Sequence, residues 1–228
     1  MSDIKFVNYR VISTIFETMR NAIFGLLLLF SVMMHAQSDS VLYTQGFAFN
    51  TGIYLTFDQF RTNSPIPKSA IVFEADTSRM DFLKQVTIKD QIQYKDSTGK
   101  VITVKTINTW GYCENKTVYV RYNYTFNRVV VIGSICHFTA SVTDYMYTGP
   151  GTAPNQQYGT PVETMQQFVI DFQYGTIYDF SPKTMEFLLQ RDTVLLTEYQ
   201  SLKKKQKKDQ AFIYLRKYNE KHPVYFPK

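Results

Sequence analysis

The chain has 228 residues, of which 44% are hydrophobic and 19% charged, and its formal net charge is +6. This balance excludes a disordered chain and a protein with several membrane spans, and ten glycines exclude a collagen-like chain. Two cysteines and three histidines are too few for a disulfide-stapled or metal-rich scaffold, whereas the 16% of aromatic residues favours half-buried strands.

The N-terminus carries the pattern of an export signal. Residues 22–34 form an unbroken apolar run that follows Arg20 and precedes Ala36. Because the run is shorter than the ~20 residues that span a bilayer, it predicts a cleaved signal peptide over residues 1–36. We therefore expect a protein of the periplasm, the outer-membrane surface or the extracellular space, with no transmembrane span after cleavage. An uncleaved N-terminal anchor is the alternative.

The residues before the apolar run do not resemble a leader. Asp3 and Glu17 are acidic where a signal peptide is usually basic. We therefore expect translation to begin at Met19 and residues 37–228 to form a single mature domain.

The first half of the mature chain predicts a short helix followed by strands. Thr56 and Gln59 form a capping box that begins the helix, and Pro65 ends it. Alternation of apolar and polar residues then predicts strands, and a turn at 96–100 joins two of them into a hairpin. The predicted strands are 70–74, 85–94, 101–107, 110–113, 117–124 and 129–138, with a last hairpin at 167–180.

Two segments of this region stand apart. Residues 129–132 are apolar at every position, which predicts a central strand that is buried on both faces. Residues 146–161 show no periodicity and contain glycine and proline throughout, which predicts a long loop.

The pattern changes to a helical period after the last hairpin. Ser181 before Pro182 begins one helix, and Asp192 begins a second. The apolar stripe resumes after a lysine-rich run and ends before Pro223. We therefore predict an α+β fold, with a mostly antiparallel meander sheet over about 50–180 followed by helices over 181–222.

Three groups of short motifs resemble an uncharacterised group of secreted proteins from Bacteroidota, whose leaders often end in Ala-Gln. The resemblance covers most of the mature chain, implies export from a Gram-negative cell and implies no activity. The motifs are Gly52-Ile53-Tyr54-Leu55-Thr56-Phe57 with Phe60 and Asn63-Ser64-Pro65, Trp110-Gly111-Tyr112-Cys113 with Ile132-Gly133-Ser134-Ile135 and Phe138, and Lys217-Tyr218-Asn219-Glu220 before Pro223.

Three tyrosines are the candidate binding residues. Tyr145, Tyr147 and Tyr158 lie in or beside the predicted loop, where exposed rings can stack on a sugar or a peptide. We expect a recognition site for an unknown protein or glycan of the cell envelope at this loop.

The lysine run is the second candidate site. Residues 199–228 hold nine lysines and arginines against two acids, so attraction for an anionic partner is concentrated there. The run contacts an anionic surface in one interpretation and is a solvated part of a helix in the other. Export and the lack of interleaved aromatic residues disfavour nucleic acid as the partner of this run. The candidate residues are Lys203, Lys204, Lys205, Lys207 and Lys208.

No catalytic residue, metal ligand set or cofactor motif is predicted. His137 and His222 are far apart in the sequence and read as structural or surface histidines. Asp171 and Asp179 flank the last hairpin turn and would have to face each other to act as a hydrolytic carboxylate pair.

The two cysteines are expected to be buried free thiols. In the predicted meander, Cys113 and Cys136 lie on strands that the 117–124 strand separates. Two strand spacings of about 4.8 Å exceed the ~7 Å that a disulfide tolerates between Cα atoms.

Three hypotheses follow for function. The leading one is an exported, non-enzymatic domain of the envelope or periplasm that binds a partner through the loop. The alternatives are an envelope hydrolase that acts on a glycan or a peptide, and a membrane-surface protein that docks through its lysines.

Overall fold

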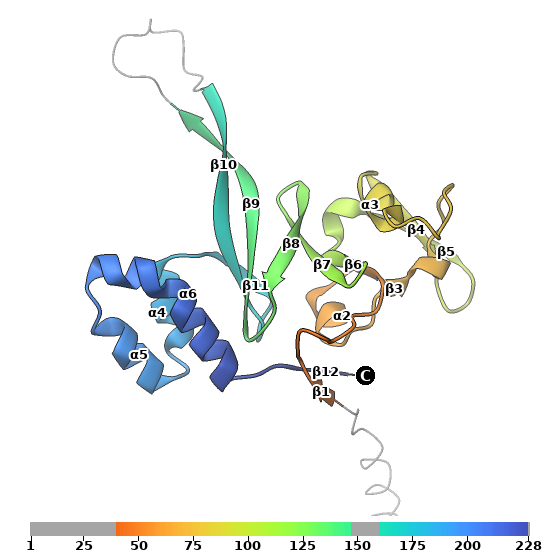
Figure 1. Ribbon diagram of the computed structural model, residues 1–228. Helices are drawn as coiled ribbons and strands as arrows, with labels where there is room; N and C mark the ends of the chain where they lie inside the picture. The colour runs from red at the N-terminus through yellow and green to blue at the C-terminus, as the bar shows by residue number, and fades with distance from the viewer. Residues whose placement is uncertain (1–39, 147–159, 228) are drawn as a thin grey trace, which may run out of the picture. The chain divides into compact units, whose positions relative to one another are not determined.

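The computed structural model describes residues 40–146 and 160–227 (Figure 1). Its helices are α2 (Phe57–Arg61), α3 (Phe82–Thr87), α4 (Pro182–Leu189), α5 (Thr193–Gln200) and α6 (Lys204–Lys221), with 3-10 turns at Lys68–Ala70 and Thr106–Asn108. Its strands are β1 (Ser40–Leu42), β2 (Gly52–Tyr54), β3 (Ile66–Pro67), β4 (Gln91–Lys95), β5 (Val101–Lys105), β6 (Gly111–Glu114), β7 (Thr117–Tyr122), β8 (Thr125–Val131), β9 (Ile135–Met146), β10 (Thr160–Asp171), β11 (Thr176–Asp179) and β12 (Tyr225–Pro227).

The main sheet has eight strands in the order β11-β10-β9-β8-β7-β6-β2-β3, and neighbouring strands pair antiparallel. From β6 to β11 each strand pairs with its neighbour in the sequence, so the predicted meander is confirmed. β4 with β5 and β1 with β12 form two separate pairs. With the helices at the C-terminal end of the chain, the fold is α+β as predicted.

Residues Val41–Phe226 form one compact unit. In the described part of the chain, no helix has both the length and the apolar character needed to cross a membrane.

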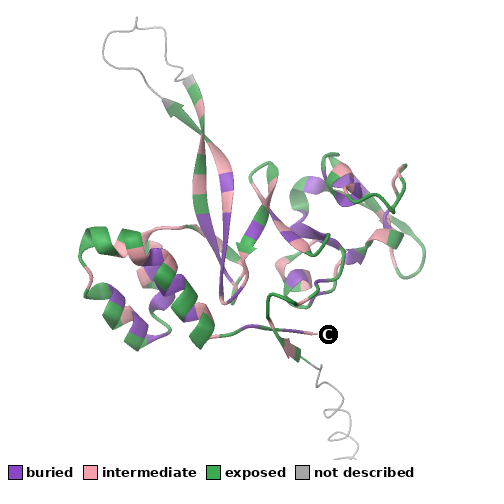
Figure 2. Ribbon diagram, viewed as in Figure 1, coloured by how far each residue is buried: buried purple, intermediate pink, exposed green. Residues whose placement is uncertain are grey.

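Strand β10 separates two hydrophobic cores. Phe168 and Ile170 pack into a cluster with many phenylalanines, whereas Val169 packs under the C-terminal helices. This alternation follows from the two-residue period of a strand. Figure 2 shows the buried residues near the β11 end of the β9–β10 pair, and mostly exposed or half-buried residues toward its other end.

The predicted strand over 85–94 is wrong in its first half, which forms α3. Phe82, Leu83 and Val86 are buried at helical spacing, while Ile88 is 72% exposed. The N-terminus of α3 is satisfied from a distance, because the Glu114 carboxylate accepts hydrogen bonds from the N–H groups of Leu83 and Lys84 at 2.9 and 3.3 Å. No local sequence motif predicts a cap from a residue that is so distant in the sequence.

Two other strand predictions are also corrected. Residues 70–74 form no strand, and only Ile71 makes a single bridge, to Tyr94. Residues 129–138 belong to two strands, β8 and β9, with a turn between them. Val130 is 62% exposed, so β8 is not buried on both faces.

Cys113 and Cys136 are buried free thiols, as predicted. Two strands, β7 and β8, lie between them, one more than the predicted meander contained. Burial raises the pKa of each thiol to about 12, so neither is a ready nucleophile.

The predicted helix starts are confirmed. The Ser181 side chain accepts from the Thr184 N–H at 3.2 Å, and the Asp192 side chain accepts from the Leu195 N–H at 3.2 Å. Helix α6 begins at Lys204, inside the lysine run.

One side chain ties the end of α6 to the sheet. The Asn219 amide accepts from the Ile135 N–H at 2.8 Å and donates to the Ile135 carbonyl at 2.9 Å. Gly133 makes room for it, because a Cβ at that position would lie 2.5 Å from the Asn219 side chain.

We expect Asn219→Ala to lower the free energy of unfolding by about 2–4 kcal/mol, because it leaves one donor and one acceptor of a buried residue unpaired at about 1–3 kcal/mol each. Chemical denaturation measures the change. Glu220→Ala, at an exposed position of the same helix, is the control and should change stability by less than about 0.5 kcal/mol. Equal effects of the two substitutions would contradict the anchoring role of Asn219.

Candidate functional site

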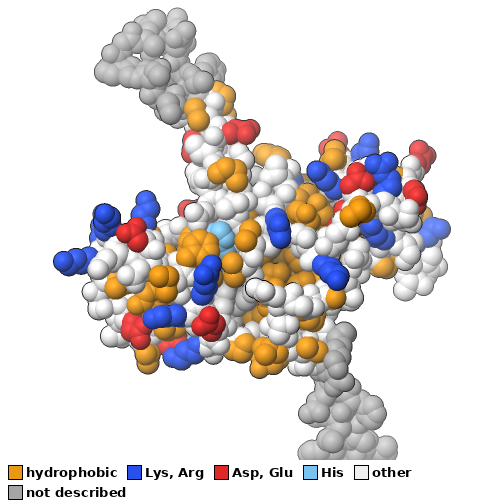
Figure 3. Space-filling view, viewed as in Figure 1, with side chains coloured by type: hydrophobic (Ala, Val, Ile, Leu, Met, Phe, Trp, Pro, Cys, Tyr) orange, Lys and Arg blue, Asp and Glu red, His pale blue; other side chains and the backbone are white. Residues whose placement is uncertain are grey.

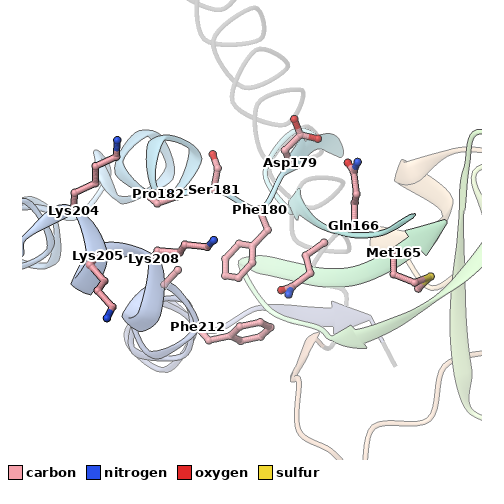
Figure 4. Close-up of a pocket in the computed structure, with 12 residues that line it drawn as sticks. Met165, Gln166, Asp179, Phe180, Ser181, Pro182, Lys204, Lys205, Lys208 and Phe212 are labelled. Carbon is pink, nitrogen blue, oxygen red and sulfur yellow. The ribbon is translucent and has the colours of Figure 1, made fainter. Parts of the chain in front are cut away.

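A pocket of about 1020 Å³ lies between the β10–β11 hairpin and the helices α4 and α6 (Figure 4). Three lysines of α6 and the rings of two phenylalanines contribute to its walls. The lining residues are Met165, Gln166, Gln167, Asp179, Phe180, Ser181, Pro182, Lys204, Lys205, Lys208, Ala211 and Phe212.

Helical spacing places the α6 residues on one wall. Lys204, Lys208 and Phe212 recur every four residues, so their side chains follow one another along the same face of the helix. Ala211 lies beside this row and is too small to fill the space. In the region of the C-terminal helices, Figure 3 shows lysine and arginine side chains beside exposed hydrophobic ones.

An aromatic cluster closes the inner side of the pocket. The Phe180 and Phe212 rings meet edge to face, with centroids 4.9 Å apart, and the buried His137 ring lies 4.5 Å from Phe212 and 5.3 Å from Phe180. Burial lowers the pKa of His137 below its usual 6.5, so this imidazole is neutral at pH 7.

Neutral His137 orients a side chain of the pocket. Its Nε2 lies 3.2 Å from Oε1 of Gln167, and its Nδ1 has no partner in the described part of the chain. This contact assigns the imidazole proton to Nε2, which donates to Gln167 Oε1. The amide N–H₂ of Gln167 is then left as a donor for a bound group.

The structure divides the predicted lysine site. Lys204, Lys205 and Lys208 line the pocket and make no ion pair with any described residue. Lys207 instead forms an ion pair with Glu186 at 2.6 Å, and Lys203 is the N-cap of α6.

The predicted tyrosine site is only partly described. Tyr145 lies on β9 and is 61% exposed, whereas Tyr147 and Tyr158, with residues 147–159 of the predicted loop over 146–161, lie outside the described residues. The structure does not bring Tyr145 into the pocket.

The proposed carboxylate pair does not form. Asp179 is opposite Phe168 and Asp171 is opposite Thr176, which places the two carboxylates on opposite faces of the hairpin. Asp171 is fully buried and forms a two-point ion pair with Arg191, at 2.8 and 2.6 Å. The hydrolase hypothesis therefore loses the acids on which it was based.

Within the described residues, no group of three or more histidine, cysteine or acidic side chains is arranged to hold a metal ion. His137 is oriented toward Gln167, and His222 lies 2.8 Å from Asp192 at the end of α6.

Sequence reasoning identified the lysines of the pocket but missed Phe180, Phe212 and Gln167 as neighbours of those lysines. The four-residue spacing from Lys204 to Phe212 was the one available signal. The rest depends on how α6 packs against β10, a contact between residues about forty positions apart that no local pattern specifies.

We expect the stability of the protein to fall as the pH is lowered from 7 to 5. Below pH 6.5 the unfolded chain takes up a proton on His137 more readily than the folded chain does. The stabilisation that neutral His137 gives the folded state is therefore complete above that pH and is lost below it. One proton limits the slope to about 1.4 kcal/mol per pH unit. His137→Gln should flatten the dependence measured by denaturation at several pH values, and an unchanged slope would contradict a neutral, buried His137.

No curated protein and no solved structure matches the chain. Residues 52–222 match a family of unknown function, DUF6563. This match covers every strand and helix that forms the pocket, and the chain belongs to this family.

Proposed function

We propose that the protein is an exported, non-enzymatic domain that binds an anionic group of an envelope partner in the pocket between β10 and α6. The observation that carries the proposal is the set of three lysines, Lys204, Lys205 and Lys208, on the wall of a pocket with an aromatic inner side. Asp179 is the one acid among the lining residues, so the positive charge is in excess.

The arrangement is typical of a binding site. Ligand pockets are mostly apolar, with a few polar groups that fix the orientation of the ligand, and their volumes are about 300–1,000 Å³. Lys204, Lys205 and Lys208 are exposed, so each attracts an anion as a surface charge does and the three act together. The Gln167 amide adds a neutral donor whose orientation His137 fixes.

The three lysines of the pocket are exposed and differ from Lys207 in their partners. Lys207, in the same run, already has the Glu186 carboxylate as its partner. The other three are close enough to act on one ligand, since they lie within five consecutive residues of one helix.

Replacing Lys204, Lys205 and Lys208 together with glutamine should weaken the binding of an anionic probe about tenfold, since exposed ion pairs contribute up to about 1 kcal/mol each. The probes are a polyglutamate peptide, an oligogalacturonate and vesicles that contain phosphatidylglycerol. Lys84, Lys89 and Lys95 are exposed lysines outside the pocket, and their joint replacement by glutamine is the control of equal charge.

Titration at constant ionic strength measures the affinities of both variants and the wild type. The control variant should stay within about twofold of the wild type. Equal weakening in both variants would mean that net charge alone explains the effect, which would contradict a specific site. A wild type that binds none of the three probes would also contradict the proposal.

Export is the second part of the proposal, and it rests on the apolar run at 22–34. When the full chain is produced in a Gram-negative host, mass spectrometry should find a protein that begins at Gln37 outside the cytoplasm. Recovery of the intact N-terminus from the cytosol would contradict export.

A further inference from the structure

Strand β10 presents unused backbone groups beside the pocket. The Phe180 N–H donates to the Gln167 carbonyl at 2.8 Å, so the backbone of Gln167 points away from β9. In an antiparallel strand, alternate residues point both backbone groups to the same side. The N–H and C=O groups of Met165 and Glu163 therefore point to the same edge as Gln167.

No strand covers this part of the edge in the described structure. β9 pairs with β10 along Thr160–Asp171, but β11 pairs only with Phe168–Asp171 and then leads into α4. No backbone hydrogen bond to the outward groups of Glu163 or Met165 occurs among the described residues. The free edge ends at Pro161, which has no N–H to donate.

A strand added at this edge would pass over the pocket. Met165 and Gln167 have the same parity as Val169, which packs under the helices, so their side chains lie on the helix-facing side of β10. Every second side chain of an added strand would lie on that side, next to Lys204, Lys205 and Lys208.

The charges on this side favour an acidic strand. The three lysines outnumber the acids, since Glu163 is the one described acid on this side of the edge and Asp179 projects from the opposite face of the hairpin. An acidic side chain opposite Met165 would meet the lysines and also the Gln167 amide.

We propose that the partner is a protein that binds as an extended acidic segment, adding a strand to the edge of β10 at Glu163–Met165 and placing its carboxylates in the pocket. This inference rests on the proposed function and specifies the form of its ligand. Backbone hydrogen bonds supply affinity in this binding mode, and alternate side chains supply specificity.

The test uses a fluorescent, acetylated and amidated peptide of seven residues in which glutamate alternates with valine, and the full-length protein. Met165→Pro removes an outward N–H and no bond to β9, so it should weaken binding at least tenfold. Thr143→Pro is the matched control. Thr143 is opposite Glu163, so its N–H points to the outer edge of β9, and this variant should bind within twofold of the wild type.

A second probe avoids any change to the protein. The same peptide with N-methylated valines keeps its charge but loses backbone donors, and it should bind at least tenfold more weakly. In hydrogen exchange, the unmodified peptide should slow exchange of the Glu163 and Met165 amides and leave that of Thr143 unchanged.

The outcomes separate the two proposals. One outcome is that Met165→Pro and N-methylation leave the affinity for the peptide unchanged while the triple lysine variant still weakens binding. The pocket then binds anions without strand addition, and the present inference is wrong. The same holds if the oligogalacturonate or the phosphatidylglycerol vesicles bind more tightly than the peptide. If no anionic probe binds, the proposed function itself fails.

Discussion

The two hydrogen bonds between the Asn219 amide and the Ile135 backbone fix the C-terminal helices against the sheet. Ile135 begins β9, and its N–H and C=O point away from β10, where an amide side chain takes the place of a neighbouring strand. The Ser134 hydroxyl reinforces the contact by donating to the His222 carbonyl at 2.6 Å. Because Lys204 lies fifteen residues from Asn219, about 22 Å along the helix, a small tilt at this anchor would displace the lysine wall of the pocket.

A series of polar contacts to two buried aspartates extends from this anchor. Lys221 and His222, at the end of α6, both lie within 3 Å of the Asp192 carboxylate, which caps α5. These contacts hold the pKa of Asp192 well below its usual range. Arg191, the residue before Asp192, forms an ion pair with Asp171 of β10. Breaking the pair at the fully buried Asp171 is costly because it leaves an unpaired charge, so the geometry of the helices is strongly determined even though α4 and α5 have only 8 residues each.

Periodicity predicted most of the strands, both helix caps and the α+β class because these depend on neighbouring residues. Helix α3 was missed because Glu114, about thirty residues away, satisfies its first N–H groups. Several residues of the short sequence motifs have structural roles: Asn219 and Gly133 dock α6, and Trp110 stacks on Phe60 with centroids 4.5 Å apart. The pocket lysines could be named from sequence, but the aromatic side could not, since packing between distant segments creates it.

Both edges of the β9–β10 pair are partly uncovered among the described residues, but only the edge of β10 lies beside the pocket. An exposed strand edge invites pairing with another chain, so proteins usually block it. On β9, β8 covers His137 and Phe138 and the Asn219 amide covers Ile135, whereas no described segment covers the edge from Thr139 onward. On β10, β11 ends at Asp179, and no described strand covers the edge from Met165 toward Pro161. This stretch of β10 and the α6 lysines that pair with no described acid lie beside the same pocket, where one acidic strand satisfies both.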